Sequence, residues 1–147
     1  MNKYFNDAVI GNKNMVASYT KQGELLRVLY PNVDYKQFVD FFHIGLKVND
    51  SGIIYLHNDI NNSYNQYYVE DTNVLKTEIF NSYFGLHITQ TDFVMIKENV
   101  LVKRYEFENE SHLDLDLNLI AYSGLLTNQN NQASRICKIR LSNSIYT

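Results

Sequence analysis

The most regular feature of the sequence is an alternation of apolar and polar residues with a period of two. In residues 42–48 (FHIGLKV), Phe, Ile, Leu and Val fall on one face, and His, Gly and Lys fall on the other. The longest such run is residues 112–119 (HLDLDLNL), in which four leucines share a face. Successive side chains of a β-strand point to opposite faces, so this pattern predicts strands with one dry and one wet face. No segment shows the spacing of a long amphipathic helix.

Turn signals separate these runs at short intervals, as in the Asp-Ser-Gly of residues 50–52. The predicted strands are residues 8–10, 15–20, 24–30, 41–48, 53–57, 67–70, 74–80, 86–96, 100–108 and 112–119. Nine or ten short strands with turns every 8–12 residues are typical of an antiparallel β-sandwich. We therefore predict an all-β fold, with residues 1–147 as a single domain. The asparagine-rich segments 58–65 and 128–132 are predicted to be turns.

One corner of the chain is unusual because it holds the only proline, in the sequence LYPNVDYKQF of residues 29–38. Pro31 ends the strand before it, since proline has no N–H to donate to a ladder. It also keeps Tyr30 extended. Asp34 can cap the backbone groups of the turn. A turn does not require two large aromatic side chains, so Tyr35 and Phe38 make the corner a candidate contact surface as well.

Composition and charge narrow the classes of partner. The 147 residues carry a net charge of −3, and the 13 basic residues are scattered rather than clustered, which argues against nucleic acid. No stretch approaches 18 continuous apolar residues, and the N-terminus lacks the apolar run of a signal peptide. These features predict a cytoplasmic chain without a membrane segment. Cys137 is the only cysteine, which excludes an intrachain disulfide and a cysteine-based metal cage.

Candidate carboxylates for hydrolytic chemistry exist, but their pattern favours a simpler role. Cleavage of a glycosidic bond uses two carboxyl groups that are about 5–10 Å apart in a cleft. Asp114 and Asp116 are two residues apart on the wet face of a predicted strand, and Glu106, Glu108 and Glu110 repeat that arrangement. We interpret both sets as solvated faces of strands, and we predict no catalytic residue in this chain.

Other catalytic or metal-binding patterns are equally weak. The four histidines are His43, His57, His87 and His112. No two have the i, i+2 spacing that places neighbours on one face of a strand, so we predict no metal site and no cofactor. A G-x-S-x-G elbow and a phosphate-binding glycine loop are both absent from the sequence.

Three segments near the N-terminus resemble a family pattern. They are residues 7–17 (DAVIGNKNMVA), residues 23–27 (GELLR) and residues 30–35 (YPNVDY). Their order and spacing are similar to the opening of bacterial glucoamylase-like enzymes, the family 15 glycoside hydrolases. That opening commonly runs A-[VI]-[IL]-G-N-G-x-[ML], then x-G-x-[LI], then a W/Y-P-x-x-D corner. Lys13 stands where the family often has glycine, and later segments carry no diagnostic motif.

The resemblance implies a division of labour between domains. Enzymes of this family place an N-terminal β-supersandwich before an (α/α)₆ barrel that holds both catalytic glutamates, and they act on α-linked glucans or oligosaccharides. The matching motifs belong to the sandwich, so the resemblance implies an incomplete sandwich that scaffolds an absent catalytic domain. It also implies that Tyr30, Pro31, Asp34, Tyr35 and Phe38 dock against that domain. A sandwich separated from its partner exposes apolar surface and strand edges, so we also expect a homodimer.

An independent carbohydrate-binding module is the alternative, because tyrosine rings can stack on sugars. Candidate platforms are Tyr64 with Tyr67 and Tyr68, or Tyr83 with Phe84. A small β-enzyme whose site is assembled from distant residues is the third possibility. Binding of an oligosaccharide without hydrolysis distinguishes the module from the enzyme, and neither activity favours the scaffold.

Overall fold

The computed structural model describes residues 6–31 and 37–125. Within these residues it contains ten strands: β1 (Ala8–Gly11), β2 (Val16–Tyr19), β3 (Leu25–Leu29), β4 (Val39–Val48), β5 (Ile53–Tyr55), β6 (Asn62–Tyr68), β7 (Val74–Asn81), β8 (Leu86–Val94), β9 (Leu101–Asn109) and β10 (Leu117–Leu125). Every pairing between them is antiparallel. The predicted all-β antiparallel fold is confirmed.

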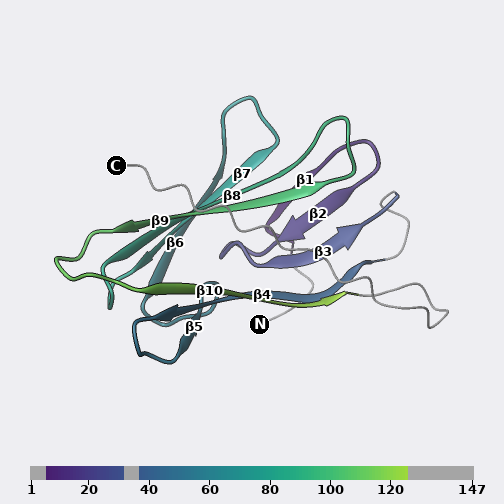
Figure 1. Ribbon diagram of the computed structural model, residues 1–147. Coiled ribbons are helices and arrows are strands. Elements are labelled where there is room, and N and C mark those ends of the chain that lie inside the picture. The colour runs from purple at the N-terminus through teal and green to yellow at the C-terminus, as the bar shows by residue number, and fades with distance from the viewer. Residues whose placement is uncertain (1–5, 32–36, 126–147) are drawn as a thin grey trace.

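The strands form three sheets that make a sandwich. Their orders are β1-β2-β3, β10-β4-β5 and β6-β7-β8-β9. In Figure 1, the four-stranded sheet forms the upper layer, with β4, β5 and β10 beneath it and β1 to β3 at its right-hand end. Strand β4 is long enough to lie beneath both parts.

Two apolar clusters fill the space between the layers. The first joins β1, β2 and β3 to one end of the four-stranded sheet through residues such as Ile10, Tyr19 and Leu75. The second joins β4 to the other end through residues such as Leu46 and Ile88. Strands β7 and β8 alternate strictly between buried and half-buried residues, so they supply the inner face to both clusters. Burial of these side chains is the main stabilising contribution.

Strand β6 begins inside a segment that the sequence predicts to be a turn. The asparagine-rich residues 58–65 suggested a loop, but Asn62 already pairs with Asn81 of β7. The inward-facing polar side chains find partners there: Asn62 donates to the Leu56 carbonyl oxygen at 2.9 Å, and Gln66 donates to the Thr20 carbonyl oxygen at 3.0 Å. Hydrogen bonding of these amides removes the usual penalty for polar groups in a strand.

The alternation of residues 112–119 also overstates a strand, because β10 starts only at Leu117. Its first pair is with Val48, the last residue of β4, and the turn after β4 begins with Asn49 at a φ of 50°. Residues before Leu117 therefore have no β4 residue to pair with. Leu113 is 71% exposed, so only the later leucines of this run pack against the core. Pattern alone cannot reveal where the partner strand ends.

The described residues include no helix that is long and apolar enough to cross a membrane.

Candidate functional site

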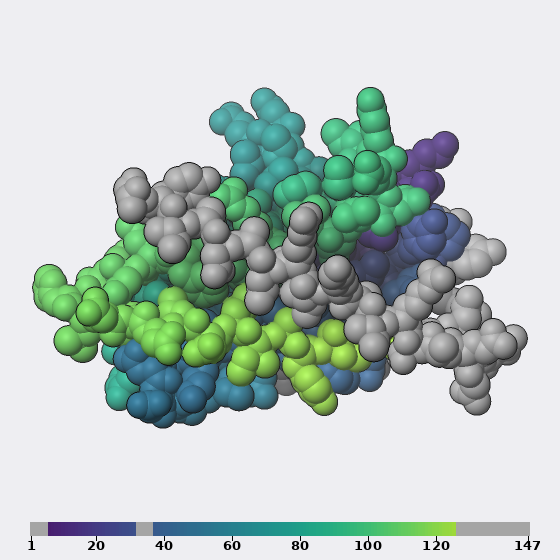
Figure 2. Space-filling view, in the orientation of Figure 1, coloured from purple at the N-terminus to yellow at the C-terminus, as the bar shows by residue number. Residues whose placement is uncertain are grey.

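The outer side of the β10-β4-β5 sheet carries four side-chain rings and one isoleucine, which we together call the aromatic face: Phe41, His43, Tyr55, Ile120 and Tyr122. The alternation of β4 sends Ile44 and Leu46 into the core, so the residues between them point outward. Antiparallel register then aligns neighbours across the sheet. Tyr122 lies opposite His43, and Ile120 and Tyr55 lie on either side of Gly45. In Figure 2, β10 crosses the front of the molecule at its surface.

The rings of this face contact one another. The centroids of Phe41 and Tyr122 are 5.0 Å apart, and Phe41 lies 5.6 Å from His43 with nearly parallel rings. His43 meets Tyr55 edge-on at 6.1 Å. Phe41 also packs against the backbone of Gly124, where an added Cβ would be only 2.5 Å from the ring. Mutual packing of this kind holds aromatic side chains in fixed orientations.

An open hollow of about 230 Å³ lies in the middle of the aromatic face. Gly45 forms its floor, because it has no side chain to fill the space, and Ile53, Tyr55, Ile120 and Tyr122 form its walls. Tyr55 is 50% exposed and Tyr122 is 61% exposed. An exposed apolar hollow with tyrosines at its rim is characteristic of a binding surface rather than of a core.

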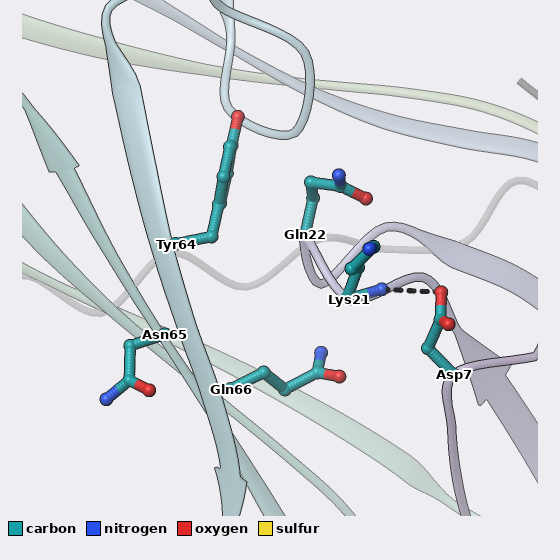
Figure 3. A pocket seen from close by; sticks show the side chains of 6 residues that line it. All are labelled: Asp7, Lys21, Gln22, Tyr64, Asn65 and Gln66. Atoms are coloured by element: carbon teal, nitrogen blue, oxygen red, sulfur yellow. Dashed lines mark hydrogen bonds between the residues drawn. The ribbon is translucent and has the colours of Figure 1, made fainter.

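A second hollow, of about 490 Å³, is polar and lies between β6 and the turn after β2 (Figure 3). Asp7 accepts a hydrogen bond there from the Lys21 backbone N–H at 3.0 Å. Figure 3 shows Gln66 directed toward Lys21 and Asp7, whereas Asn65 points away from them. The lining residues supply a single carboxylate, and glycosidic cleavage by the usual mechanism needs two. This hollow therefore lacks the chemistry of a glycosidase site.

The structure brings together three of the five residues predicted to form the docking corner. Tyr30 and Phe38 are half-buried, with ring centroids 6.2 Å apart, and Pro31 is exposed. Asp34 and Tyr35 lie outside the described residues. Phe38 is not fully buried, so its exposure remains compatible with docking.

Neighbouring loops support the same corner. Asn99, in the loop between β8 and β9, donates a hydrogen bond to the Tyr30 hydroxyl at 3.3 Å. Asn12 donates to the carbonyl oxygens of Met95 and Glu98 in that loop, at 2.8 and 3.0 Å. Ile96 of the same loop is almost completely exposed. One end of the sandwich thus combines an aromatic pair with an exposed apolar loop.

Of the two aromatic platforms predicted from the sequence, that of Tyr64, Tyr67 and Tyr68 does not form a common surface. Tyr64 faces inward, packs against the second core cluster and donates to the Leu56 carbonyl oxygen at 3.0 Å. Tyr67 points the other way and donates to Glu78 at 2.9 Å, and the Tyr68 hydroxyl bonds the backbone of Val9. Tyr83 and Phe84 do contact each other, edge to face at 4.8 Å. They lie in the turn between β7 and β8, where Phe84 also packs against the second core cluster.

Asp114 and Asp116 are exposed as predicted, but they do not lie on the face of a strand. Both belong to the connection before β10. On the outer surface of the four-stranded sheet, polar atoms of His87, Glu108 and Glu110 lie within 4.8 Å of one another, and the His87 Nδ1 to Glu108 distance is 3.9 Å. Cross-strand pairing of β8 with β9 creates this cluster, which no local spacing could reveal. These groups are open to solvent, as charged residues on a sheet surface usually are.

A buried chain of polar groups connects all three sheets. The Lys103 ammonium donates to Asp92 at 2.7 Å. The Gln90 side-chain nitrogen donates to Asp92 at 2.5 Å and to the Gly23 carbonyl oxygen at 2.8 Å. The Gln90 side-chain oxygen lies 2.8 Å from His57 Nε2. Burial lowers the pKa of His57 to about 4. Burial also lowers the pKa of Lys103, although the negative charge of Asp92 acts in the opposite direction and raises it.

This network stabilises the sandwich rather than acting on a substrate. The Asp92 side chain has no exposed surface, and that of Lys103 is only 10% exposed. The Lys103 ammonium also lies 4.7 Å from the centroid of the Tyr19 ring. A substrate cannot reach groups enclosed in this way, so the aromatic face and the docking corner are the two candidate contact surfaces.

The aromatic face was missed at the level of sequence. His43 and Gly45 were assigned to the wet side of their strand, and Tyr55 and Tyr122 are 67 residues apart in the chain. The local signal was the presence of Phe41 and His43 two residues apart, next to a glycine. That signal indicates a surface site only when β10 and β5 are known to flank β4, because those strands supply the other rings.

The fold defines the chain as an antiparallel β-sandwich, and the aromatic face and the docking corner are candidate contact surfaces outside its core. Over 122 residues, or 83% of its length, the chain is 30% identical to a protein of Methanocaldococcus jannaschii named as an uncharacterized glycosyl hydrolase. The chain covers 19% of that protein, so it spans about a fifth of the length of the curated relative that it matches. No family model and no solved structure matches the chain.

Proposed function

We propose that this chain is a non-catalytic β-sandwich domain of a glycosyl hydrolase. In this proposal, the domain scaffolds a separate catalytic region, an (α/α)₆ barrel that acts on α-linked glucans or oligosaccharides. The observation that carries the proposal is the similarity of most of the chain to one fifth of a protein named as a glycosyl hydrolase. A domain that covers one fifth of the larger protein leaves most of that protein available for a separate catalytic region.

The chemistry of the described surfaces supports a scaffold rather than a catalyst. The lining of the polar hollow holds one carboxylate, and that of the apolar hollow holds none. The buried Asp92 is paired with Lys103 and shielded from solvent. The residues of both hollows thus lack the pair of carboxyl groups that glycosidic hydrolysis uses.

The docking corner is the proposed contact with the catalytic region. Tyr30, Pro31 and Phe38 form its described part, with the exposed Ile96 beside it in the neighbouring loop. Exposed aliphatic and aromatic side chains with a polar surround are typical of the centre of a protein interface. Asp34 and Tyr35 extend this proposed contact along the chain.

A chimera tests the proposal. The matching segment of the Methanocaldococcus jannaschii protein is replaced by this chain in one version and deleted in another. We expect the chimera to be soluble and to unfold in one cooperative transition. We expect the deletion to expose the surface of the catalytic region that this domain covers, and therefore to aggregate. Equal solubility and stability of both versions would remove the scaffold role.

Two substitutions in the chimera separate docking from folding of the sandwich. Tyr30→Ala is expected to lower the stability of the chimera more than that of the isolated chain, because it removes a contact between domains. Tyr83→Ala is the matched control, since Tyr83 is 74% exposed in a loop that is not part of the corner. Equal effects of Tyr30→Ala in both contexts would place the corner outside the interface.

A further inference from the structure

We propose that the aromatic face binds neutral pyranose oligosaccharides, with one sugar ring in the hollow above Gly45. The inference rests on the proposed function for the class of ligand, and on the geometry of the face for the site. The two tyrosines of the hollow come from β5 and β10, on opposite sides of β4.

The shape of the hollow fits a small ring. Its volume of about 230 Å³ corresponds to roughly eight water molecules at their liquid volume. Gly45 creates the depth: a Cβ there would lie 2.7 Å from the Ile53 side chain and would occupy the floor. Ile53 and Ile120 give the hollow apolar walls, and Tyr55 and Tyr122 give it exposed rings.

The chemistry of the face fits a sugar. A pyranose presents C–H groups on its flat faces and hydroxyl groups around its edge. Tyrosine matches both, because its ring supplies apolar area and its hydroxyl supplies a hydrogen-bonding group at the rim. His43, which lies 3.3 Å from Glu24, adds a further polar group beside the hollow.

The hollow itself offers no charged side chain to a ligand. Its lining residues include no carboxylate, lysine or arginine, and two side chains of opposite charge lie at the edge of the face: Glu24, 3.3 Å from His43, and Lys47, which pairs with Ile53. A charged ligand would lose hydration in the hollow without gaining an ion pair inside it. An uncharged polyol with apolar faces is the complementary partner.

The phenylalanine next to the hollow makes the site rigid. Phe41 packs against Gly124 and contacts both His43 and Tyr122, so the Tyr122 ring is supported on one side. Pre-ordered aromatic groups lose little conformational entropy when a ligand binds. This support distinguishes the aromatic face from the Tyr83–Phe84 pair, which lies in a loop.

Titration of the full chain, labelled with ¹⁵N, with maltoheptaose and with cellohexaose tests the inference. We expect a dissociation constant on the order of 1 mM with at least one of the two, and amide shifts centred on Gly45, Tyr55 and Tyr122. Tyr122→Ala and Tyr55→Ala are each expected to weaken binding about tenfold or more. Tyr83→Ala, the matched control, is expected to leave binding unchanged.

Three results would overturn the inference. They are no shift with either sugar, shifts that avoid the face, and binding that survives both tyrosine substitutions. A dimer that Tyr122→Ala dissociates would instead make the face a contact between copies of the chain. If the chimera is stable but the chain does not bind sugar, only this inference fails. If the chain binds sugar but the chimera is unstable, only the scaffold role fails.

Discussion

At the residue scale, the buried polar network sets how the chain responds to pH. His57 is almost fully buried, and its Nε2–H donates a hydrogen bond to the Gln90 side-chain oxygen. Because burial disfavours the charged form, its pKa falls from 6.5 to about 4. The folded protein therefore binds a proton at His57 less readily than the unfolded chain does.

Stability should fall as the pH falls below the ordinary histidine range. Above pH 6.5 the imidazole is neutral in both states, so its contribution is fully present, and it is lost as the pH drops toward 4. The difference between the pKa of His57 in the unfolded and folded states corresponds to about 3 kcal/mol of unfolding free energy. Urea unfolding at pH 7 and pH 4.5 measures the loss, and His57→Gln should reduce it. An NMR titration midpoint for His57 near 6.5 would contradict the expectation.

The Lys103–Asp92 pair should depend on both partners together. Lys103→Met leaves the Asp92 carboxylate buried without its cation, which should cost about 3–5 kcal/mol of unfolding free energy. The double variant Lys103→Met with Asp92→Leu removes both charges, so it should be more stable than Lys103→Met alone. Denaturant unfolding of the original chain, the two single variants and the double variant completes the cycle. A double variant that shows the sum of two large losses would mean that the charges do not act as a pair.

At the scale of elements, the positions of strands were largely predictable, whereas their pairing and the details of turns were not. Alternation in residues 42–48 identified β4, which has one face in the core, and the predicted strand 86–96 contains β8. The start of β6 was hidden, because Asn62 gains its partners from Leu56 and Asn81, which lie outside that strand. The aromatic face was hidden for a similar reason: β10 completes it, and β10 is distant in sequence from β4 and β5.

The docking corner shows the opposite case, in which a local signal was sufficient to find a candidate. Pro31 and its aromatic neighbours stand out in the sequence, and the structure places Tyr30 next to Phe38. The resemblance supplied a role for this corner, which the chain's own residues could not. The contact itself remains a prediction, and the chimera tests it.

The turn between β2 and β3 gives a sharp test at this scale. Gly23 has a φ of 83°, a conformation that side chains disfavour, and an added Cβ would be 2.9 Å from the Thr77 hydroxyl oxygen. Its carbonyl oxygen also accepts from Gln90. Gly23→Ala should therefore cost about 1–3 kcal/mol of unfolding free energy.

Gly52→Ala is the matched control for this turn. A Cβ at Gly52 meets nothing within 4 Å, so the substitution should change stability by no more than about 0.5 kcal/mol. Thermal or urea unfolding compares the two variants. Equal losses would show that the Gly23 backbone is not strained by a side chain.

At the scale of the whole molecule, the three sheets of the described residues each end in edge strands. Strands β6, β9, β10 and β5 end their sheets, and edges of this kind can pair with another chain. We therefore expect the isolated chain to form a two-fold dimer through its edges at high micromolar concentration. Sedimentation equilibrium measures the mass, and Tyr122→Ala should leave it unchanged. A strictly monomeric particle would contradict this expectation.

The central claim is that the chain belongs beside a hydrolytic site and does not itself contain one. The most direct test is release of reducing sugar from maltoheptaose by the purified chain. Our interpretation predicts a rate equal to that of the buffer control, because neither described hollow is lined by two carboxylates. Release above that control, abolished by substituting Asp7 or another carboxylate of the chain, would contradict the claim.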